Sequence, residues 1–87
     1  MNFQLTKKFL NRIELLINNN DSKAILKVCE DLLAPDVAEI ITSLNFYDAK
    51  FMLDLFNEEM SADILIELED DFREKLLNKL SSKEIVE

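Results

Sequence analysis

Five acidic residues in the second half of the chain have the types and the spacing to bind a metal cation. Asp63 and Glu67 are four positions apart, so their carboxylates lie on one face of a helix. Glu69, Asp70 and Asp71 crowd the turn that follows. Carboxylate oxygens are the ligands that hard divalent cations take in proteins. These five residues are the candidate metal ligands, and we expect them to form only part of any site. The alternative interpretation is a solvated acidic face, with acids at helix starts opposing the helix dipole.

Other reactive groups are scarce in this sequence. The chain has no histidine, no glycine and a single cysteine. Zinc and haem sites of the ordinary kind, imidazole acid–base catalysis and glycine-rich phosphate loops are therefore excluded. One cysteine also provides no disulfide framework. Because no nucleophile stands beside a base, the sequence favours a binding or regulatory protein that is not an enzyme.

The net charge of −8 is distributed unevenly along the chain. Residues 1–33 contain 4 acids and 5 bases, a balance of +1, whereas residues 34–87 contain 14 acids and 5 bases, a balance of −9. An acidic half is a poor fit for nucleic acid, because affinity there comes from neutralising phosphates. It suits cations, basic partners or simple solubility. No apolar run exceeds three residues, so we expect no membrane insertion by this segment.

A repeated apolar pattern predicts the elements that must position these acids. An apolar pair, with a third apolar residue three positions after the pair, returns five times at a spacing of twelve residues. Such a trio lies on one face of a helix, and twelve residues is one short amphipathic helix plus a tight turn. The predicted fold class is all-α: a superhelical stack of short helices of either hand, an armadillo-like α-solenoid. The pattern positions are Val28, Cys29 and Leu32; Ile40, Ile41 and Leu44; Met52, Leu53 and Phe56; Ile64, Leu65 and Leu68; and Leu76, Leu77 and Leu80. Among them we expect Cys29 to be a small, buried apolar residue.

A second period, twice as long as the first, makes the structural unit a helix pair. Residues 37–44 match residues 61–68, with an alanine–acid–apolar–apolar order at 38–41 and 62–65, and residues 85–87 begin a third copy in register. We expect one helical-repeat domain over the whole chain, with an opening helical hairpin at 1–33 and short-helix repeats at 34–87. Since the sequence stops within a repeat, we expect it to be a fragment of a longer protein.

Turn and cap residues predict where the helices begin and end. Asparagines in the turn over 18–21 tolerate the left-handed conformation that ends a helix. Asp21 or Ser22 can cap the second helix, and Pro35 suits the first turn of the third. A serine–glutamate capping box over 81–84 predicts one more helix start. The expected helices are 3–17, 21–33, 36–44, 47–56, 59–68, 71–80 and 83 onward.

Four segments and the recurrence of the helix pair occur in a characteristic order: Ile13–Ile17, the turn at Asn20 and Asp21, Ala24–Leu26, and Leu33–Ile41. In this order and spacing the chain resembles the N-terminal cytoplasmic domain of MgtE-type magnesium transporters. Residues 35–39 fit the family segment without gaps, whereas Ala34 stands where histidine is common. The resemblance covers about residues 10–87.

The resemblance implies a regulatory role in magnesium transport. In that family this domain is a superhelix of short helices on the cytoplasmic side of the bacterial cell membrane. Paired cystathionine-β-synthase-type domains and a transmembrane domain follow in the same chain, which assembles as a homodimer. Mg²⁺ held by carboxylates between this domain and the next stabilises the closed state. The family's bridging carboxylates lie mostly near the end of the domain, so none is carried over to a residue here. We expect Mg²⁺ to bind weakly or not at all to this segment alone.

A second hypothesis is a protein–protein interaction solenoid of another system. Flagellar motor-switch proteins share the short-helix, armadillo-like architecture, and their stacked helices bind partner helices. The two hypotheses differ in what must follow Glu87 in the gene: cystathionine-β-synthase-type repeats and apolar segments for a transporter, and a soluble ending for the alternative.

Overall fold

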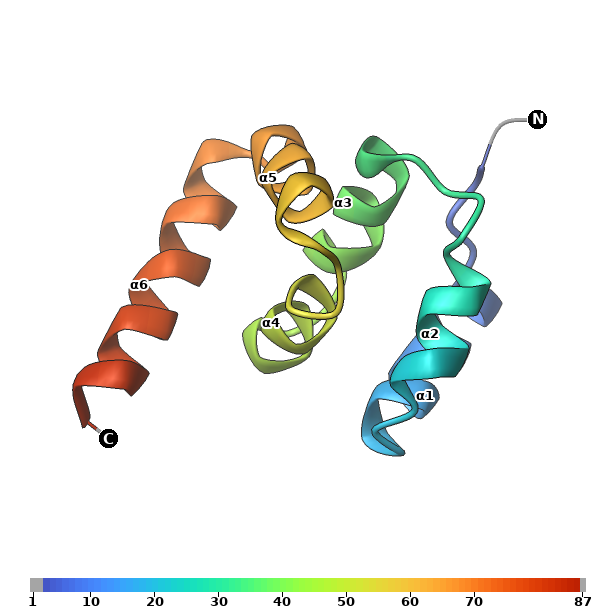
Figure 1. The fold of residues 1–87 in the computed structure, drawn as a ribbon, viewed down its shortest axis with the longest axis horizontal. Helices are drawn as coiled ribbons and strands as arrows, with labels where there is room; N and C mark the ends of the chain where they lie inside the picture. Colours follow the sequence, from blue (N-terminus) through green and yellow to red (C-terminus); the bar gives the residue numbers. More distant parts are fainter. Residues whose placement is uncertain (1–2, 87) are drawn as a thin grey trace.

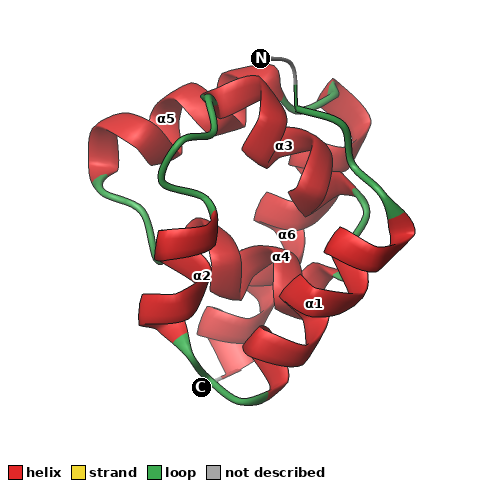
Figure 2. Ribbon diagram, turned by 90° about the vertical axis from the view of Figure 1, so that its right-hand side faces the viewer, coloured by secondary structure: helices red, strands yellow, loops and turns green. Residues whose placement is uncertain are grey.

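Six α-helices form the regular secondary structure of the described part of the chain (Figure 1). A computed structural model describes the backbone of residues 3–86 and the side chains of residues 3–78. Within residues 3–86 there is no β-strand, and Figure 2 shows only helices and loops, so the predicted all-α fold is confirmed. The helices are α1 (Lys7–Asn18), α2 (Ser22–Val28), α3 (Ala34–Thr42), α4 (Phe46–Leu53), α5 (Glu58–Glu67) and α6 (Asp70–Val86).

Five of these helices begin at a constant interval. Helices α2 to α6 begin at residues 22, 34, 46, 58 and 70, so each start lies twelve residues after the one before. Side-chain caps fix three of the starts. Asp21, Asn45 and Asn57 each accept a hydrogen bond from the backbone N–H three residues later, at 3.2, 2.9 and 2.8 Å. A side-chain oxygen at this position satisfies an N–H group that the helix itself leaves without a partner.

The start of α3 depends on an acid and a proline instead. Leu33 occupies the cap position and has no side-chain acceptor, but the Asp36 carboxylate accepts a hydrogen bond from the Leu33 backbone N–H at 3.1 Å. Pro35 lies in the first turn, where its missing N–H leaves no bond unmade. The predicted place of Pro35 is confirmed.

The first helix begins later than predicted, at Lys7 rather than at residue 3. Thr6 caps it by accepting a hydrogen bond from the Phe9 backbone N–H at 3.1 Å. Residues 3–6 are not helical, and the ring of Phe3 packs edge-on against that of Phe9 with centroids 5.3 Å apart. At the other end, Asn20 has a φ of 54°, the left-handed conformation predicted for this turn.

Four helices end earlier than predicted, because the third pattern position lies in a turn and not on the helix. Helices α2, α3, α4 and α5 end at residues 28, 42, 53 and 67, whereas the pattern predicted 33, 44, 56 and 68. Leu32, Leu44, Phe56 and Leu68 donate their backbone N–H groups to the carbonyl oxygens three residues earlier, at 3.0, 3.1, 3.3 and 3.3 Å. These tight turns return the third apolar side chain of each copy to the interior.

Side chains of α5 and α6 also bind the end of the helix before them. The Ser61 hydroxyl donates to the carbonyl oxygens of Leu53 and Phe56 at 3.1 and 3.3 Å. The Arg73 guanidinium donates to the carbonyl oxygen of Leu65 at 3.1 Å. Carbonyl groups at a helix end have no partner within their own helix, so these bonds join consecutive helices.

The predicted break near Ser81 and the separate helix from residue 83 are wrong. Helix α6 runs without interruption from Asp70 to Val86. A serine caps a helix only where the preceding chain has left the helical conformation, and no proline, glycine or asparagine between Leu80 and Glu84 interrupts it here. The side chain of Leu80 lies outside the described residues, so its predicted core position is not tested.

In the described part of the chain, two of the five closely packed helix pairs begin two twelve-residue intervals apart. These two are α3 with α5 and α4 with α6, and the further close pairs are α1 with α2, α3 with α4, and α1 with α4. The stacked rings of Phe46 and Phe72, with centroids 5.3 Å apart, contribute to the contact of α4 with α6. Among the described pattern positions, only Leu77 is exposed, at 44%. The buried core consists of Ile13, Ile17, Ile25, Cys29, Val37, Ala38, Ile40, Ile41, Leu44, Ala49, Met52, Leu53, Ile64, Leu68 and Leu76.

Candidate functional site

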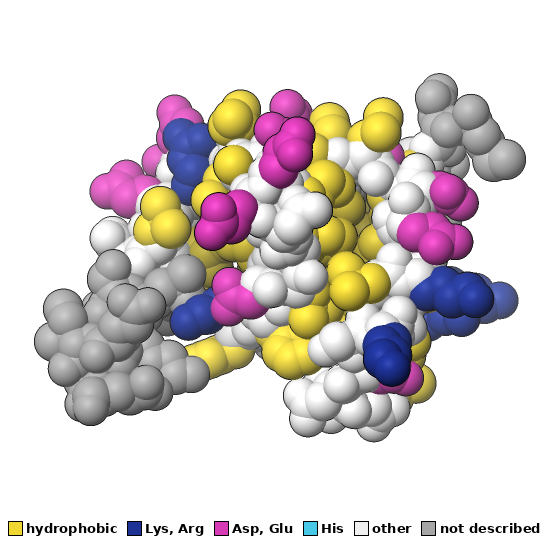
Figure 3. Space-filling view, viewed as in Figure 1, with side chains coloured by type: hydrophobic (Ala, Val, Ile, Leu, Met, Phe, Trp, Pro, Cys, Tyr) yellow, Lys and Arg dark blue, Asp and Glu magenta, His cyan; other side chains and the backbone are white. Residues whose placement is uncertain are grey.

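All five candidate metal ligands are exposed on the surface of α5, of α6 and of the turn between them. Asp63 and Glu67 lie on α5, Glu69 lies in the turn, and Asp70 and Asp71 form the first turn of α6. On the face shown in Figure 3, acidic side chains are spread over several elements rather than gathered in one place. Within the described residues, no group of three or more histidine, cysteine or acidic side chains has the arrangement of a metal site.

Asp70 already has a partner. One of its carboxylate oxygens lies 2.6 Å from the Arg73 guanidinium, and the same guanidinium donates to the Leu65 carbonyl oxygen. Asp70 is 91% exposed, so this ion pair adds little to stability by itself, but it orients Arg73 toward the end of α5. A cation that binds Asp70 must therefore compete with Arg73.

Several acids have a structural role at helix starts, as the alternative interpretation supposes. Asp36, Asp48, Glu58 and Glu59 lie in the first turns of α3, α4 and α5, and Asp70 and Asp71 do so in α6. Negative charge there opposes the positive end of the helix dipole, a contribution of about 0.3–1 kcal/mol at an exposed site. Asp63 and Glu67 lie farther along α5, and that role does not account for them.

Cys29 is buried, as predicted, with 2% of its surface exposed. Burial disfavours the thiolate and raises the pKa of the Cys29 thiol to about 11. At neutral pH the group is therefore a protonated, apolar core side chain. It is not a nucleophile of the kind that a lowered pKa produces.

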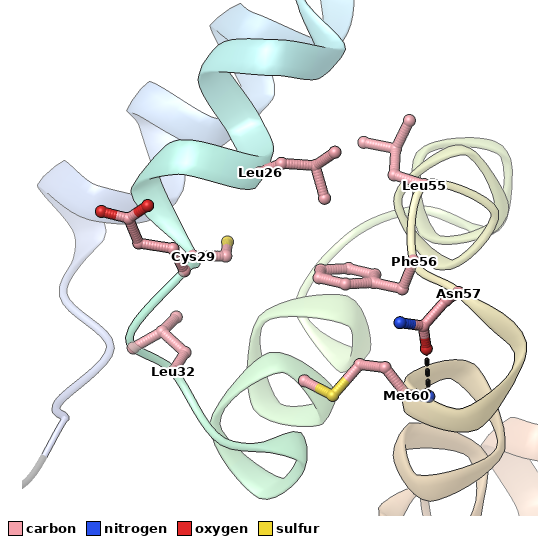
Figure 4. A pocket seen from close by; sticks show the side chains of 8 residues that line it. Leu26, Cys29, Leu32, Leu55, Phe56, Asn57 and Met60 are labelled. Atoms are coloured by element: carbon pink, nitrogen blue, oxygen red, sulfur yellow. Dashed lines mark hydrogen bonds between the residues drawn. The ribbon is translucent and has the colours of Figure 1, made fainter.

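The sequence did not predict one hollow in the described surface. A pocket of about 440 Å³ lies between α2 and the joint of α4 with α5 (Figure 4). Figure 4 shows the side chains of Leu26 and Leu55 approaching each other across it, with the Phe56 ring directed toward Cys29. Its lining is Leu26, Cys29, Glu30 and Leu32 from α2 and the turn after it, and Leu55, Phe56, Asn57 and Met60 from the joint.

The lining of this pocket supplies little chemistry beyond apolar contact. The Asn57 side-chain oxygen accepts the hydrogen bond from the Met60 backbone N–H that caps α5, as Figure 4 shows. Glu30 is the only charged residue among the lining residues. The one available signal was that Leu32 and Phe56 are third pattern positions two intervals apart, but the pattern did not indicate that the space between them stays open.

Comparison with known proteins identifies the second, acidic part of the chain. Residues 32–87, which include α3 to α6 and all five candidate ligands, match the family model described as the MgtE intracellular N domain. No curated protein and no solved structure gives a significant match to the chain. Within the described residues, no helix is both long and apolar enough to cross a membrane.

Proposed function

The chain belongs to the family of MgtE intracellular N domains, and from this membership we propose that it is the magnesium-sensing regulatory domain of a magnesium transporter. The observation that carries the proposal is the match over residues 32–87, which is more than half of the chain. The family is a transporter-domain family and not an enzyme family. Membership also favours this function over the flagellar motor-switch alternative.

The charge of the matched segment supports a sensing role. All 14 acids and 5 bases of residues 34–87 lie within the match, a balance of −9. Two acidic surfaces that face each other repel, and a divalent cation between them removes the repulsion. Mg²⁺ would then favour the compact arrangement of this domain against the following one, which is a shift between two conformational populations.

The exposed acids near the joint of α5 with α6 are the proposed contribution of this chain to such a site. Asp63, Glu67, Glu69 and Asp71 are exposed, and Mg²⁺ in proteins commonly takes one or two carboxylates and keeps several waters. Asp70 would join them only after its pair with Arg73 opens. In this proposal the facing domain completes the coordination, because the described residues do not bring three ligands together by themselves.

We also propose that the helices are part of a superhelical stack, an armadillo-like α-solenoid. Helix starts at a constant interval of twelve residues and the close packing of α3 with α5 and of α4 with α6 support this architecture. In the full-length protein the proposed partners are the cystathionine-β-synthase-type domains and the transmembrane domain of the same chain, in a homodimer. The domain would then work on the cytoplasmic side of a bacterial cell membrane.

The test is whether Mg²⁺ strengthens the association of this chain with the domain that follows it in its family. The chain is titrated with a purified cystathionine-β-synthase-type domain pair from an MgtE transporter of the same organism, in EDTA and in about 10 mM MgCl₂ at equal ionic strength. The expected result is an affinity about tenfold or more higher with Mg²⁺. Equal affinities in the two buffers, or no association in either, would contradict the proposal.

Matched substitutions make this test specific for the proposed ligands. Asp63→Asn with Glu67→Gln removes two charges while keeping the shapes of the side chains, and we expect the Mg²⁺ effect to fall by at least about threefold. Glu14→Gln with Glu30→Gln removes the same charge outside the matched segment and should leave the Mg²⁺ effect unchanged. An equal loss in both variants would show that net charge, rather than this surface, is responsible.

A further inference from the structure

Helix α2 departs from the packing rule that the later helices follow. Helices α3 and α5, and α4 and α6, begin two intervals apart and pack closely, whereas α2 and α4, at the same separation, are not among the closely packed pairs. Helix α2 packs closely on α1, and α1 instead contacts α4. A pocket lies between α2 and the joint of α4 with α5, and we call it the α2 groove.

The walls of the α2 groove are apolar and partly open to solvent. On one side Leu26 is 37% exposed. On the other, Leu55, Phe56 and Met60 are only half-buried. Hydrophobic side chains are visible between α2 and the central helices in Figure 3. Burying this surface against another apolar surface is favourable, as at other exposed hydrophobic patches.

We define the rim of the α2 groove as the charged residues that line it or lie within two positions of its lining residues in the sequence, and most of them are acids. Within two positions of the lining residues in the sequence there is one base, Lys27, and there are five acids. These acids are all exposed, and they are Glu30, Asp31, Asp54, Glu58 and Glu59. A surface with an apolar floor and an acidic rim is complementary to one with an apolar centre flanked by bases.

We propose that the α2 groove binds an amphipathic helix of a partner protein, whose apolar face is flanked by lysine and arginine. A helix presents apolar side chains at positions i, i+3 or i+4 and i+7 to a hydrophobic groove and carries its charged residues at the edges of that face.

Polar groups that would orient a small molecule are scarce in the α2 groove, because Asn57 is engaged as a helix cap and Glu30 alone is charged among the lining residues. The groove therefore fits a peptide better than a small polar ligand. This inference goes beyond the proposed magnesium function and does not depend on it, since the α2 groove and the candidate metal ligands use different residues.

The probe for this proposal is a synthetic peptide of about 15 residues made of leucine and lysine, with the leucines at helical spacing. Its fluorescence anisotropy is followed against the 87-residue chain at about 150 mM salt, which screens general attraction to an acidic protein. The expected Kd is in the micromolar range, about 1–100 μM. A peptide of the same composition with its leucines scrambled should bind at least about tenfold more weakly.

Two double charge reversals of equal size locate the binding surface. Glu30→Lys with Asp31→Lys changes the rim just after α2, where positive charge suits the helix end, and we expect about tenfold weaker binding of the peptide. Asp71→Lys with Glu74→Lys makes the same charge change on α6, and we expect less than about threefold. Circular dichroism of both variants confirms that each remains folded.

Substitution of an exposed leucine tests whether the apolar wall of the α2 groove contacts the peptide. Leu26→Ala shortens an exposed wall residue and should weaken peptide binding by about fivefold or more, whereas Leu15→Ala, at a residue of α1 that is 59% exposed, should not. Methyl resonances of Leu26, Leu55 and Met60 should shift on titration with the peptide.

Three results would overturn the proposal: equal binding of the scrambled peptide, equal losses in the two charge-reversal variants, or methyl shifts confined to other helices. A fourth would assign the α2 groove to a second copy of this chain. In that case the chain alone would sediment as a dimer and Leu26→Ala would convert it to a monomer.

Discussion

The hydroxyl of Ser61 donates a hydrogen bond of 3.1 Å to the carbonyl oxygen of Leu53, eight residues earlier in the chain. Twelve residues after Ser61, the Arg73 guanidinium donates a bond of the same length to Leu65, again eight residues earlier. Both acceptors are second pattern positions, and both also accept the backbone N–H of the third position, Phe56 in one copy and Leu68 in the next. The twelve-residue interval thus recurs in the hydrogen bonds that join consecutive helices as well as in the apolar core.

Removing the Ser61 hydroxyl should loosen the joint of α4 with α5. Ser61→Ala loses the bonds to Leu53 and Phe56 at a half-buried position, and we expect the free energy of unfolding to fall by about 0.5–1.5 kcal/mol in urea titrations. Ser43→Ala is the control, because the Ser43 hydroxyl bonds only to the carbonyl of Glu39 within its own helix, at an exposed position. Its loss should be below about 0.5 kcal/mol. Equal losses would contradict a special role for Ser61.

Arg73 should matter more to the joint of α5 with α6 than its ion pair does. Arg73→Ala removes the bond to Leu65 and the pair with Asp70 together, with an expected loss of about 1–2 kcal/mol. Asp70→Asn keeps the Leu65 bond but removes an exposed ion pair and one negative charge at the start of α6, for which we expect a loss of less than about 1 kcal/mol. Thermal unfolding of the two variants side by side distinguishes them, and a larger effect of Asp70→Asn would mean that the ion pair is the main contact.

Two isoleucines in α5 test the assignment of its faces. Ile64 is fully buried and Ile66 is 70% exposed. Ile64→Ala should cost about 2–4 kcal/mol, because it leaves a cavity in the core as well as losing apolar burial. Ile66→Ala makes the same chemical change two residues away and should cost less than about 0.5 kcal/mol. Similar unfolding midpoints in denaturant for both variants would show that the faces of α5 are wrongly assigned.

The buried thiol of Cys29 predicts a particular dependence of stability on pH. Burial raises its pKa from 9.0 to about 11. Below pH 9 the thiol is protonated in both folded and unfolded chains, and its contribution to stability is fully present. As the pH rises toward 11 only the unfolded chain ionises there, so stability is lost, by up to roughly 2–3 kcal/mol.

Comparison with Cys29→Ala isolates this effect, because lysine and tyrosine titrate in both proteins. The difference in unfolding free energy between the two should shrink between pH 9 and 11, and parallel pH profiles would contradict the prediction. In the folded protein at pH 8, alkylation of the thiol by iodoacetamide should be at least about 100-fold slower than in the urea-unfolded chain.

Helix starts were more predictable from the sequence than helix ends. A start is set by a few neighbouring residues, such as Asn45 or Asn57 as a cap, and α4 and α5 begin one residue before their predicted starts. A helix end depends on whether a turn can form there and on whether the residues after the turn can pack against the core. The sequence therefore extended α2 through Leu32, whereas a turn returns that residue to the core, and it divided α6 near Ser81, where the helix continues.

The candidate site was predictable only in part, for a similar reason. Exposure of Asp63 and Glu67 follows from their phase relative to the buried Ile64 and Leu68, and that phase can be read from the sequence. The pair of Asp70 with Arg73 is also local, although the bond from Arg73 to Leu65 is not. The α2 groove could not be predicted, because it lies between α2 and the joint of α4 with α5, parts of the chain that are far apart in the sequence.

A magnesium titration by calorimetry gives the sharpest test of magnesium sensing by this chain, because binding couplings are reciprocal. If Mg²⁺ strengthens the association of this chain with a cystathionine-β-synthase-type domain pair, that association must strengthen Mg²⁺ binding by the same factor. We predict weak Mg²⁺ binding to the 87-residue chain alone, in the millimolar range or beyond, and an affinity about tenfold or more higher once the domain pair is present. Stoichiometric micromolar binding to the chain alone, or an affinity that the domain pair leaves unchanged, would contradict the account.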